Sequence, residues 1–166
     1  MIPRSSGKGS FQRVLEDLDE NSTPKTIYEP GHRLALGQGA FLEIMATSES
    51  GSLIMIQWDS ARFLLAPGAD PDLILDSLDD PRLQSVSAVL LPAGGYAAVN
   101  PDEWLALLNP GVILLSLRTG EMPAELPQSI SSPLQNRSIL RTDINGTIDL
   151  TTDGSKLWIE VERVID

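Results

Sequence analysis

The chain has 166 residues, of which 42% are apolar and 21% charged, a composition typical of a globular domain and not of a disordered chain. It contains no cysteine, which excludes disulfides, thiolate metal sites and cysteine nucleophiles. Its formal net charge of −11 argues against a broad nucleic-acid-binding surface, because such surfaces neutralise phosphates with Lys and Arg.

The first part of the chain is predicted to hold one helix followed by short strands. Residues 1–9, rich in Gly and Ser, are expected to be a flexible segment ahead of one domain at residues 10–166. Ser10 is a suitable N-cap, and the residues after it have the i, i+3, i+4, i+7 spacing of an amphipathic helix: Phe11, Val14, Leu15 and Leu18. Apolar runs bounded by turn residues predict strands at 41–46, 52–58 and 61–66.

From residue 70 onwards the pattern changes to alternating helices and strands. Asp70-Pro71 is typical of a helix start, with the carboxylate at the N-cap and the proline at the first helical position. Residues 86–91 form a nearly continuous apolar run, as expected of a strand covered on both faces. Asn100-Pro101 then predicts the cap of a second helix of about two turns.

The C-terminal part is predicted to be a strand, a loop and a small antiparallel sheet. Residues 112–117 are another buried strand, and residues 120–133, with three prolines, predict a loop with at most a short helix. The Asn-Gly pair at 145–146 and the Asp-Gly pair at 153–154 are strong type I′ turn signals. They predict a three-stranded meander of residues 138–142, 147–151 and 156–162.

Candidate metal ligands are few. The single histidine, His32, begins a predicted strand beside Arg33 and is interpreted as a surface residue, since one histidine cannot build a histidine-based dinuclear site. An acidic run has Ile74 and Leu75 where a calcium loop needs an oxygen ligand and a glycine. We therefore expect a helix cap and a solvated helix face from its members: Asp70, Asp72, Asp76, Asp79 and Asp80.

Other chemical motifs are incomplete. The chain has no full dinucleotide-binding or phosphate-binding glycine motif. It also lacks a G-x-S-x-G nucleophile elbow. The residues by themselves therefore indicate no catalytic, cofactor-binding or metal site.

Four segments follow one another in an informative order: 62–69 (RFLLAPGA), 87–96 (SAVLLPAGGY), 104–116 (WLALLNPGVILLS) and 139–148 (ILRTDINGTI). They resemble the segments LLTGD, ADVLKVPHHGS, LL-x-x-x-x-P-x-x-A-I-I-S and V-x-R-T-D-x-x-G-x-I of one protein family. That family is the metallo-β-lactamase-like domain of ComEC-type DNA-uptake (competence) proteins. The RTD…G element is the most specific of these signals, and the resemblance to the C-terminal half of that domain runs from about Gly31 to the end.

This chain departs from the family at the metal ligands. Ala69 stands where the family has the Asp that bridges two metals, and residues 93–96 (AGGY) replace its HHGS. A later HP is Met122-Pro123 here, and the H-x-H-x-D-H cluster of the family's preceding half does not occur. Because alanine and glycine side chains cannot coordinate metal, the resemblance implies no metal, no cofactor, no catalytic residues and no enzyme activity.

The resemblance implies an α/β fold, namely the second half of an αβ/βα sandwich: a mixed sheet, its covering helices and the C-terminal meander. It implies a non-catalytic domain of a membrane-embedded DNA-uptake protein with a structural or interaction role. Two alternatives remain open. One is half of a metal-dependent phosphodiesterase whose ligands come from a preceding half, and the other is a free-standing protein-interaction module.

Expected partners follow from the same resemblance. They are the missing N-terminal half or the membrane region of a parent protein, and we expect a homodimer when the chain is isolated, because half of a sandwich exposes its inner sheet face. We expect neither tight nucleic-acid binding nor membrane insertion. No apolar stretch approaches the roughly 18–20 residues that cross a bilayer and no signal peptide is visible, so the expected location is a soluble domain of a bacterial inner-membrane protein.

Overall fold

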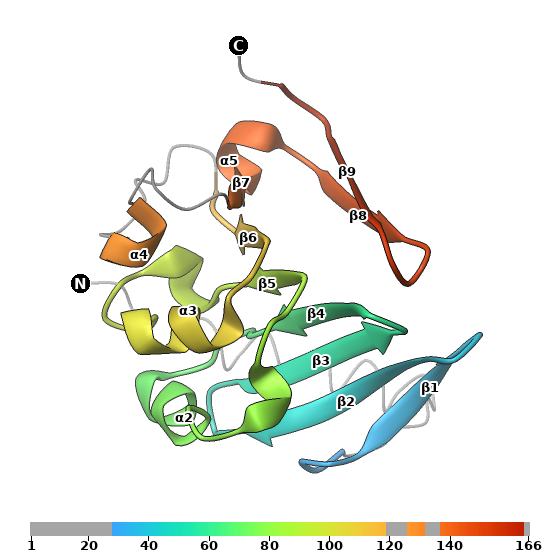
Figure 1. Ribbon diagram of the computed structural model, residues 1–166. Helices are drawn as coiled ribbons and strands as arrows, with labels where there is room; N and C mark the ends of the chain where they lie inside the picture. The colour runs from blue at the N-terminus through green and yellow to red at the C-terminus, as the bar shows by residue number, and fades with distance from the viewer. Residues whose placement is uncertain (1–27, 119–125, 132–136, 165–166) are drawn as a thin grey trace, which may run out of the picture.

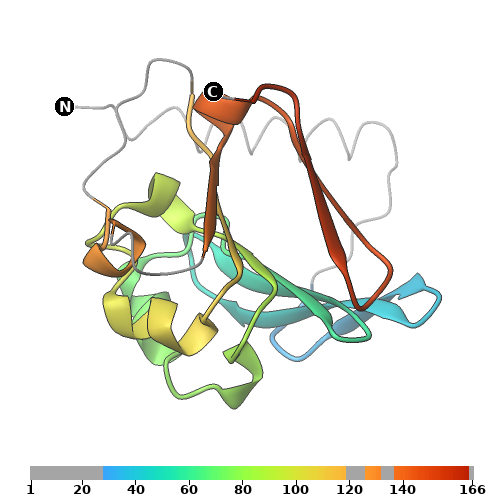
Figure 2. The same ribbon diagram turned by 45° about the horizontal axis from the view of Figure 1, so that its top comes forward.

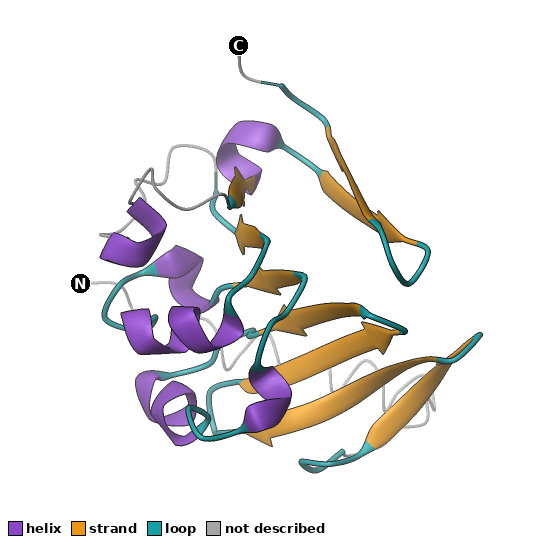
Figure 3. Ribbon diagram, in the orientation of Figure 1, coloured by secondary structure: helices purple, strands orange, loops and turns teal. Residues whose placement is uncertain are grey.

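The computed structural model describes residues 28–118, 126–131 and 137–164 (Figure 1). These residues form a seven-stranded mixed sheet, a separate two-stranded sheet and several short helices (Figure 3). The α/β class expected from the sequence is therefore confirmed. The helix predicted at residues 10–18 lies outside the described residues.

The large sheet changes from antiparallel to parallel along its width. Its strands lie side by side in chain order, and β1 to β4 pair antiparallel, whereas β4 to β7 pair parallel. The bounds of the strands are β1 (Arg33–Gly37), β2 (Ala40–Thr47), β3 (Ser52–Trp58), β4 (Ala61–Leu65), β5 (Ala88–Leu90), β6 (Val112–Leu115) and β7 (Ser138–Arg141).

Short helices connect the parallel strands, which cannot be joined by tight turns. They are α2 (Pro71–Asp76), η1 (Pro81–Leu83), η2 (Pro92–Gly95), α3 (Asp102–Leu108) and α4 (Gln128–Ser131). A further helical turn, α5 (Thr142–Asn145), follows β7 and leads to the hairpin. The Asp70 carboxylate accepts a hydrogen bond from the Leu73 amide at 2.9 Å, which confirms the cap predicted for α2. Among the described residues, no helix has the length and apolar character needed to cross a bilayer.

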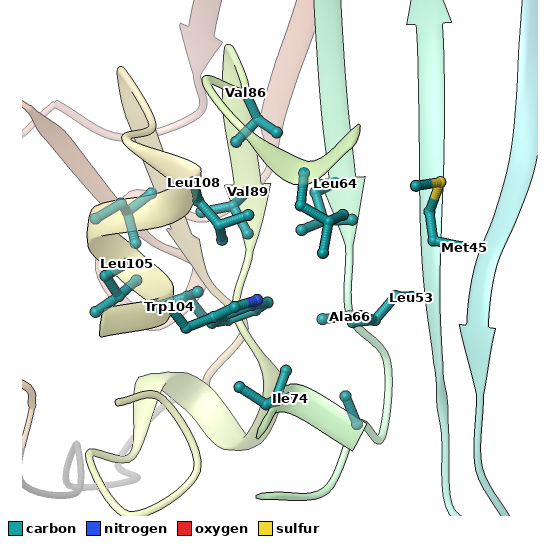
Figure 4. Packing of buried hydrophobic residues seen from close by; sticks show 14 of the residues in the cluster. Met45, Leu53, Leu64, Ala66, Ile74, Val86, Val89, Trp104, Leu105 and Leu108 are labelled. Carbon is teal, nitrogen blue, oxygen red and sulfur yellow. The ribbon is translucent and has the colours of Figure 1, made fainter. Parts of the chain in front are cut away.

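The main core lies between one face of the large sheet and helices α2 and α3. Trp104 and Leu108 of α3 are fully buried and lie against Leu64 and Val89 of the sheet (Figure 4). Ile74 of α2 closes the same cluster. This packing explains why α3 is stable, because an isolated helix of only seven residues does not hold its conformation in water unless its apolar face is buried.

The second face of the large sheet is also apolar. Strand pairing places Leu42 and Ile44 beside Ile56 and Ile54, and the alternation continues through the parallel strands with Phe63, Leu65, Ala88, Leu90, Val112 and Leu114. The hairpin of β8 (Ile148–Thr152) and β9 (Leu157–Val161) lies over this face (Figure 2). Its tip is tied to the β3–β4 turn, where the Gly154 carbonyl accepts hydrogen bonds from the amides of Ser60 and Ala61 at 2.9 and 3.0 Å.

The predicted three-stranded meander is wrong. β7 joins the large sheet parallel to β6, and among the described strands β8 and β9 pair only with each other. The Asn-Gly signal failed because the Asn145 side chain accepts a hydrogen bond from the Arg141 amide at 2.9 Å and closes a helical turn, α5. Gly146 then ends that turn at φ +71°. The Asp-Gly signal correctly located a hairpin, although its loop spans four residues, 153–156.

Other boundaries differ by smaller amounts. The strands predicted at 86–91 and 112–117 are shorter, as β5 and β6: β5 begins two residues later and ends one residue earlier, and β6 ends two residues earlier. Within residues 120–133, the described part contains the one short helix that was allowed for, α4. Strands β2, β3 and β4 match the predicted ranges to within one residue.

The packing of α3 predicts a clear contrast between two leucine truncations. Leu108→Ala should lower the free energy of unfolding by about 2–5 kcal/mol, because it leaves a cavity in the core. Leu75→Ala, on the exposed side of α2 with 54% of its surface accessible, should lower it by less than about 1 kcal/mol. Urea unfolding of the two variants and the parent chain measures both values, and equal losses would contradict the described core.

Candidate functional site

The carboxyl ends of the parallel strands β4, β5 and β6 meet at one edge of the sheet. A pocket of about 390 Å³ lies there, called here the carboxyl-edge pocket. Three loops line it, each following one of these strands: Ala66, Pro67, Gly68, Leu90, Leu91, Pro92, Ala93, Gly94, Ser116 and Leu117. This is the edge at which open α/β sheets bind their ligands.

The two segments that the resemblance aligned with metal ligands meet at this edge. Ala69 directly follows the Gly68 lining residue and is buried, while Ala93 and Gly94 line the pocket themselves. The third aligned position, Met122, lies outside the described residues. Although the first two segments are far apart in sequence, the fold therefore places them side by side.

The lining of the carboxyl-edge pocket offers little chemistry. It consists of alanine, glycine, proline and leucine with one hydroxyl, that of Ser116. Within residues 28–118, 126–131 and 137–164, no three His, Cys, Asp or Glu side chains gather where they could hold a metal ion. What the described lining can supply is backbone groups, one hydroxyl and apolar contact.

The loop at residues 93–96, which the sequence resemblance aligned with HHGS, has an unusual backbone. Ala93 is left-handed at φ +50°, and Gly94 and Gly95 follow at +61° and +86°. A Cβ on Gly94 would lie 2.6 Å from the Leu117 side chain, and one on Gly95 would lie 2.7 Å from that of Leu115. The leucine methyl groups could shift to relieve these contacts, but the positive φ at both glycines would strain any larger residue there.

Asn100 holds this loop from behind. Its side chain is fully buried and donates from Nδ2 to the carbonyls of Pro92 at 3.2 Å and Tyr96 at 2.8 Å. The sequence assigned Asn100 to the cap of the second helix, and that assignment is wrong, because Pro101 occupies the N-cap position of α3. No local signal distinguishes an asparagine that caps forwards from one that bonds backwards to a loop.

The RTD element, residues 141–143 at the end of β7, is hydrogen-bonded to the same edge of the sheet. The Thr142 hydroxyl accepts a hydrogen bond from the Leu117 amide at 2.9 Å and donates one to the Leu117 carbonyl at 2.7 Å. Arg141 pairs with Asp143 at 2.7 Å, and the hydrogen bond from the guanidinium lowers the pKa of the Asp143 carboxyl. The element therefore fixes the position of Leu117, which lines the carboxyl-edge pocket.

The remaining sequence candidates lie elsewhere. His32 is exposed in the turn before β1, as expected, and its Nδ1 accepts a hydrogen bond from the Glu29 amide at 2.8 Å. Asp70 accepts hydrogen bonds from the Ser50 hydroxyl, the Leu73 amide and the Ser48 hydroxyl, and these bonds lower the pKa of its carboxyl. The acidic run thus serves as helix caps at Asp70 and, for η1, at Asp80.

A buried carboxylate was missed by sequence reasoning. Glu43 of β2 is 5% exposed and is bound by Arg33 and by Arg82, each at 2.7 Å. Arg82 also pairs with Asp80 at 2.6 Å, and this hydrogen bonding lowers the pKa of Asp80. The network joins β1 and β2 to η1. It is a structural arrangement, because each of its carboxylates is matched by a guanidinium.

A second hollow lies on the other side of the sheet, between the sheet and the β8–β9 hairpin. This sheet-face groove has a volume of about 290 Å³. Its lining is apolar except for one hydroxyl: Ile56, Phe63, Leu64, Leu65, Ala88, Leu90, Leu114, Leu150 and Thr152. Such a surface binds apolar side chains or ligands and holds no acid–base group.

Comparison with known proteins adds no family. No protein-family model, curated protein or solved structure matches this chain. The functional argument therefore depends on the residues and geometry described above.

The Arg141–Asp143 pair predicts a pH-dependent effect of Asp143→Asn. The folded chain lowers the pKa of Asp143, so ionised Asp143 stabilises the fold at pH values above its unfolded pKa, near 4, and this stabilisation is lost as the pH falls through the folded pKa. The variant should therefore be less stable than the parent at pH 7, and the difference should shrink towards pH 3. Thermal unfolding across this range measures it, with Asp79→Asn, at an exposed position, as the control. A difference that stays constant with pH would contradict the described pair.

Proposed function

We propose that this chain is a non-catalytic, metal-free domain of the metallo-β-lactamase-like kind found in ComEC-type DNA-uptake proteins, with a structural or interaction role. The observation that carries the proposal is the meeting of residues 66–69 and 92–94 at one edge of the sheet. The resemblance aligns these two segments with metal-ligand segments, which have to be neighbours in space to share a metal. Here they meet, but they contribute alanine, glycine and proline.

The arrangement of the large sheet supports the same proposal. An αβ/βα sandwich needs a sheet with helices on one face and an apolar second face that packs on another sheet. The described sheet has α2 and α3 on one face and an apolar row on the other. In this proposal the second layer of the sandwich comes partly from β8 and β9 and otherwise from the remaining half or the membrane region of a parent protein.

The exposed end of the second face supports an interaction role. Strand β1 is exposed along its length, and Leu34 and Leu36 have 43% and 51% of their surfaces accessible. An edge strand that presents leucine side chains is suited to contact with another protein. A phosphodiesterase is supported less well, because Ala69 and Ala93 would remove ligands from a shared metal centre even if a preceding half supplied the others.

Metal analysis tests the non-catalytic part of the proposal. After loading with zinc or manganese and desalting, the chain should retain far less than one ion per molecule. His32→Ala serves as the matched variant, since it removes the single histidine and should leave the result unchanged. One tightly bound ion per chain in both proteins would overturn the proposal.

A nuclease assay with manganese and a mobility-shift titration test the expected behaviour towards DNA. With 23 acidic and 12 basic residues, the chain should repel phosphates, and it should neither cleave duplex DNA nor shift it at ~150 mM salt. Cleavage that EDTA abolishes would revive the phosphodiesterase alternative. Submicromolar duplex binding would contradict the electrostatic argument alone.

A further inference from the structure

Four hydrogen bonds converge on Asn145 and Gly146, where α5 leads into the β8–β9 hairpin (Figure 1). The Asn145 side-chain oxygen accepts from the Arg141 amide at 2.9 Å, and its Nδ2 donates to the Arg163 carbonyl at 3.4 Å. The Asn145 carbonyl accepts from the Arg163 amide at 3.0 Å, and the Gly146 amide donates to the Thr142 carbonyl at 3.1 Å. These contacts, called here the Asn145 clasp, join α5 to the residues that follow β9.

Asn145 is also the one asparagine of the chain that a glycine follows, and this pair of residues has a chemistry of its own. The Gly146 amide nitrogen can attack Cγ of Asn145, because glycine has no side chain to hinder the closing ring. The bond from Cγ to Nδ2 breaks, ammonia leaves with the amide proton, and a five-membered succinimide forms. Water then opens the ring at either carbonyl, which gives aspartate or, with the main chain running through the former side chain, isoaspartate.

We propose that Asn145 is a site of deamidation and that the Asn145 clasp controls its rate. The nucleophile, the Gly146 amide, is bonded to the Thr142 carbonyl, and the Asn145 side-chain amide is held at both of its polar atoms. Ring closure needs both groups to be released, so the reaction proceeds from molecules in which α5 has opened locally. The proposal does not rest on the proposed function, because it uses only contacts of α5 and the hairpin.

The modified chain cannot rebuild the Asn145 clasp. Either product replaces the Nδ2 donor with a carboxylate oxygen, which has no hydrogen to share with the Arg163 carbonyl. Isoaspartate also adds one carbon to the main chain, which displaces the Gly146 amide from the Thr142 carbonyl. Because the Thr142 hydroxyl holds Leu117 at the carboxyl-edge pocket, deamidation is a one-way change that loosens both the hairpin and that edge.

The Asp153-Gly154 pair in the loop of the same hairpin is less reactive. Its carboxylate accepts a hydrogen bond from the Lys156 amide at 2.7 Å, and this bond is the main cause that lowers the pKa of Asp153. An ionised carboxylate has no group that can leave readily when an amide attacks it. The Gly154 amide is also bonded to the Thr152 hydroxyl at 3.0 Å. Spontaneous change in this hairpin is therefore concentrated at Asn145.

A peptide map of the full chain, aged at mildly alkaline pH in buffer and in concentrated urea, tests the proposal. The mass increase of deamidation should fall on the peptide that contains Asn145 in both samples. It should appear at least about tenfold more slowly in buffer, because a tenfold slowing needs a local opening free energy of only about 1.4 kcal/mol. Equal rates in the two solutions would overturn the proposal, as would a change concentrated at another asparagine in buffer.

A matched pair of threonine variants tests the control by α5. Thr142→Ala removes the hydroxyl that ties the start of α5 to Leu117, and Thr151→Ala makes the same change at an exposed position of β8. Thr142→Ala should raise the rate in buffer several-fold and Thr151→Ala should leave it unchanged, while all chains react alike in urea. An unchanged rate in a folded Thr142→Ala chain would contradict the proposal. If that variant does not fold, the parent chain in buffer and urea decides.

Hydrogen exchange tests the consequence of the reaction. In aged chains that carry isoaspartate at position 145, the Gly146 and Arg163 amides should exchange faster than in fresh protein. Asn145→Asp, which keeps the length of the main chain, should change the exchange of the Gly146 amide less. Equal exchange in aged and fresh chains would show that the product rebuilds the Asn145 clasp and would overturn this part of the proposal.

Discussion

The rest of the structure depends on one constraint, which is that the large sheet is apolar on both faces. Along β3, Leu53 and Met55 point to the helices while Ile54 and Ile56 point the other way, so neither face can be left to water without cost. Helices α2 and α3 cover the first face and bury its apolar side chains. The β8–β9 hairpin covers part of the second face. It is held there by the hydrogen bonds from the Ser60 and Ala61 amides to the Gly154 carbonyl and not by strand pairing with the large sheet.

The same layered arrangement brings the loops of the carboxyl edge together, but it does not decide their chemistry. Close backbone approach is built in, because a Cβ on Gly51 would lie 2.1 Å from the Gly68 carbonyl carbon. Asn100 and Thr142 then hold the two neighbouring loops in place. A fold of this kind supports a metal centre only when its loops carry ligands. Here the loops held by these contacts present mainly alanine, glycine, proline and leucine to the carboxyl-edge pocket.

Charge is distributed so that several arginines are engaged within the fold. Arg33 and Arg82 bind the buried Glu43, and Arg141 binds Asp143. A buried carboxylate is tolerated only when such partners compensate its lost hydration. The arginines of the Glu43 network stay partly exposed, because the side chains of Arg33 and Arg82 keep 60% and 48% of their surfaces accessible.

The sequence by itself determined the elements whose signals are local. Local patterns were sufficient to predict strands β2, β3 and β4 from their apolar runs and the start of α2 from Asp70-Pro71. Hydrophobic periodicity and helix capping depend only on neighbouring residues. The sequence resemblance also aligned Ala69 and Ala93 with ligand positions of one site, and the fold brings their segments to one edge. Only the tertiary structure decided that β7 pairs with β6, that Asn100 holds the η2 loop and that Glu43 is buried between two arginines. Each of these contacts joins segments that local propensity treats separately, and their pairing is set by which apolar faces can be buried together.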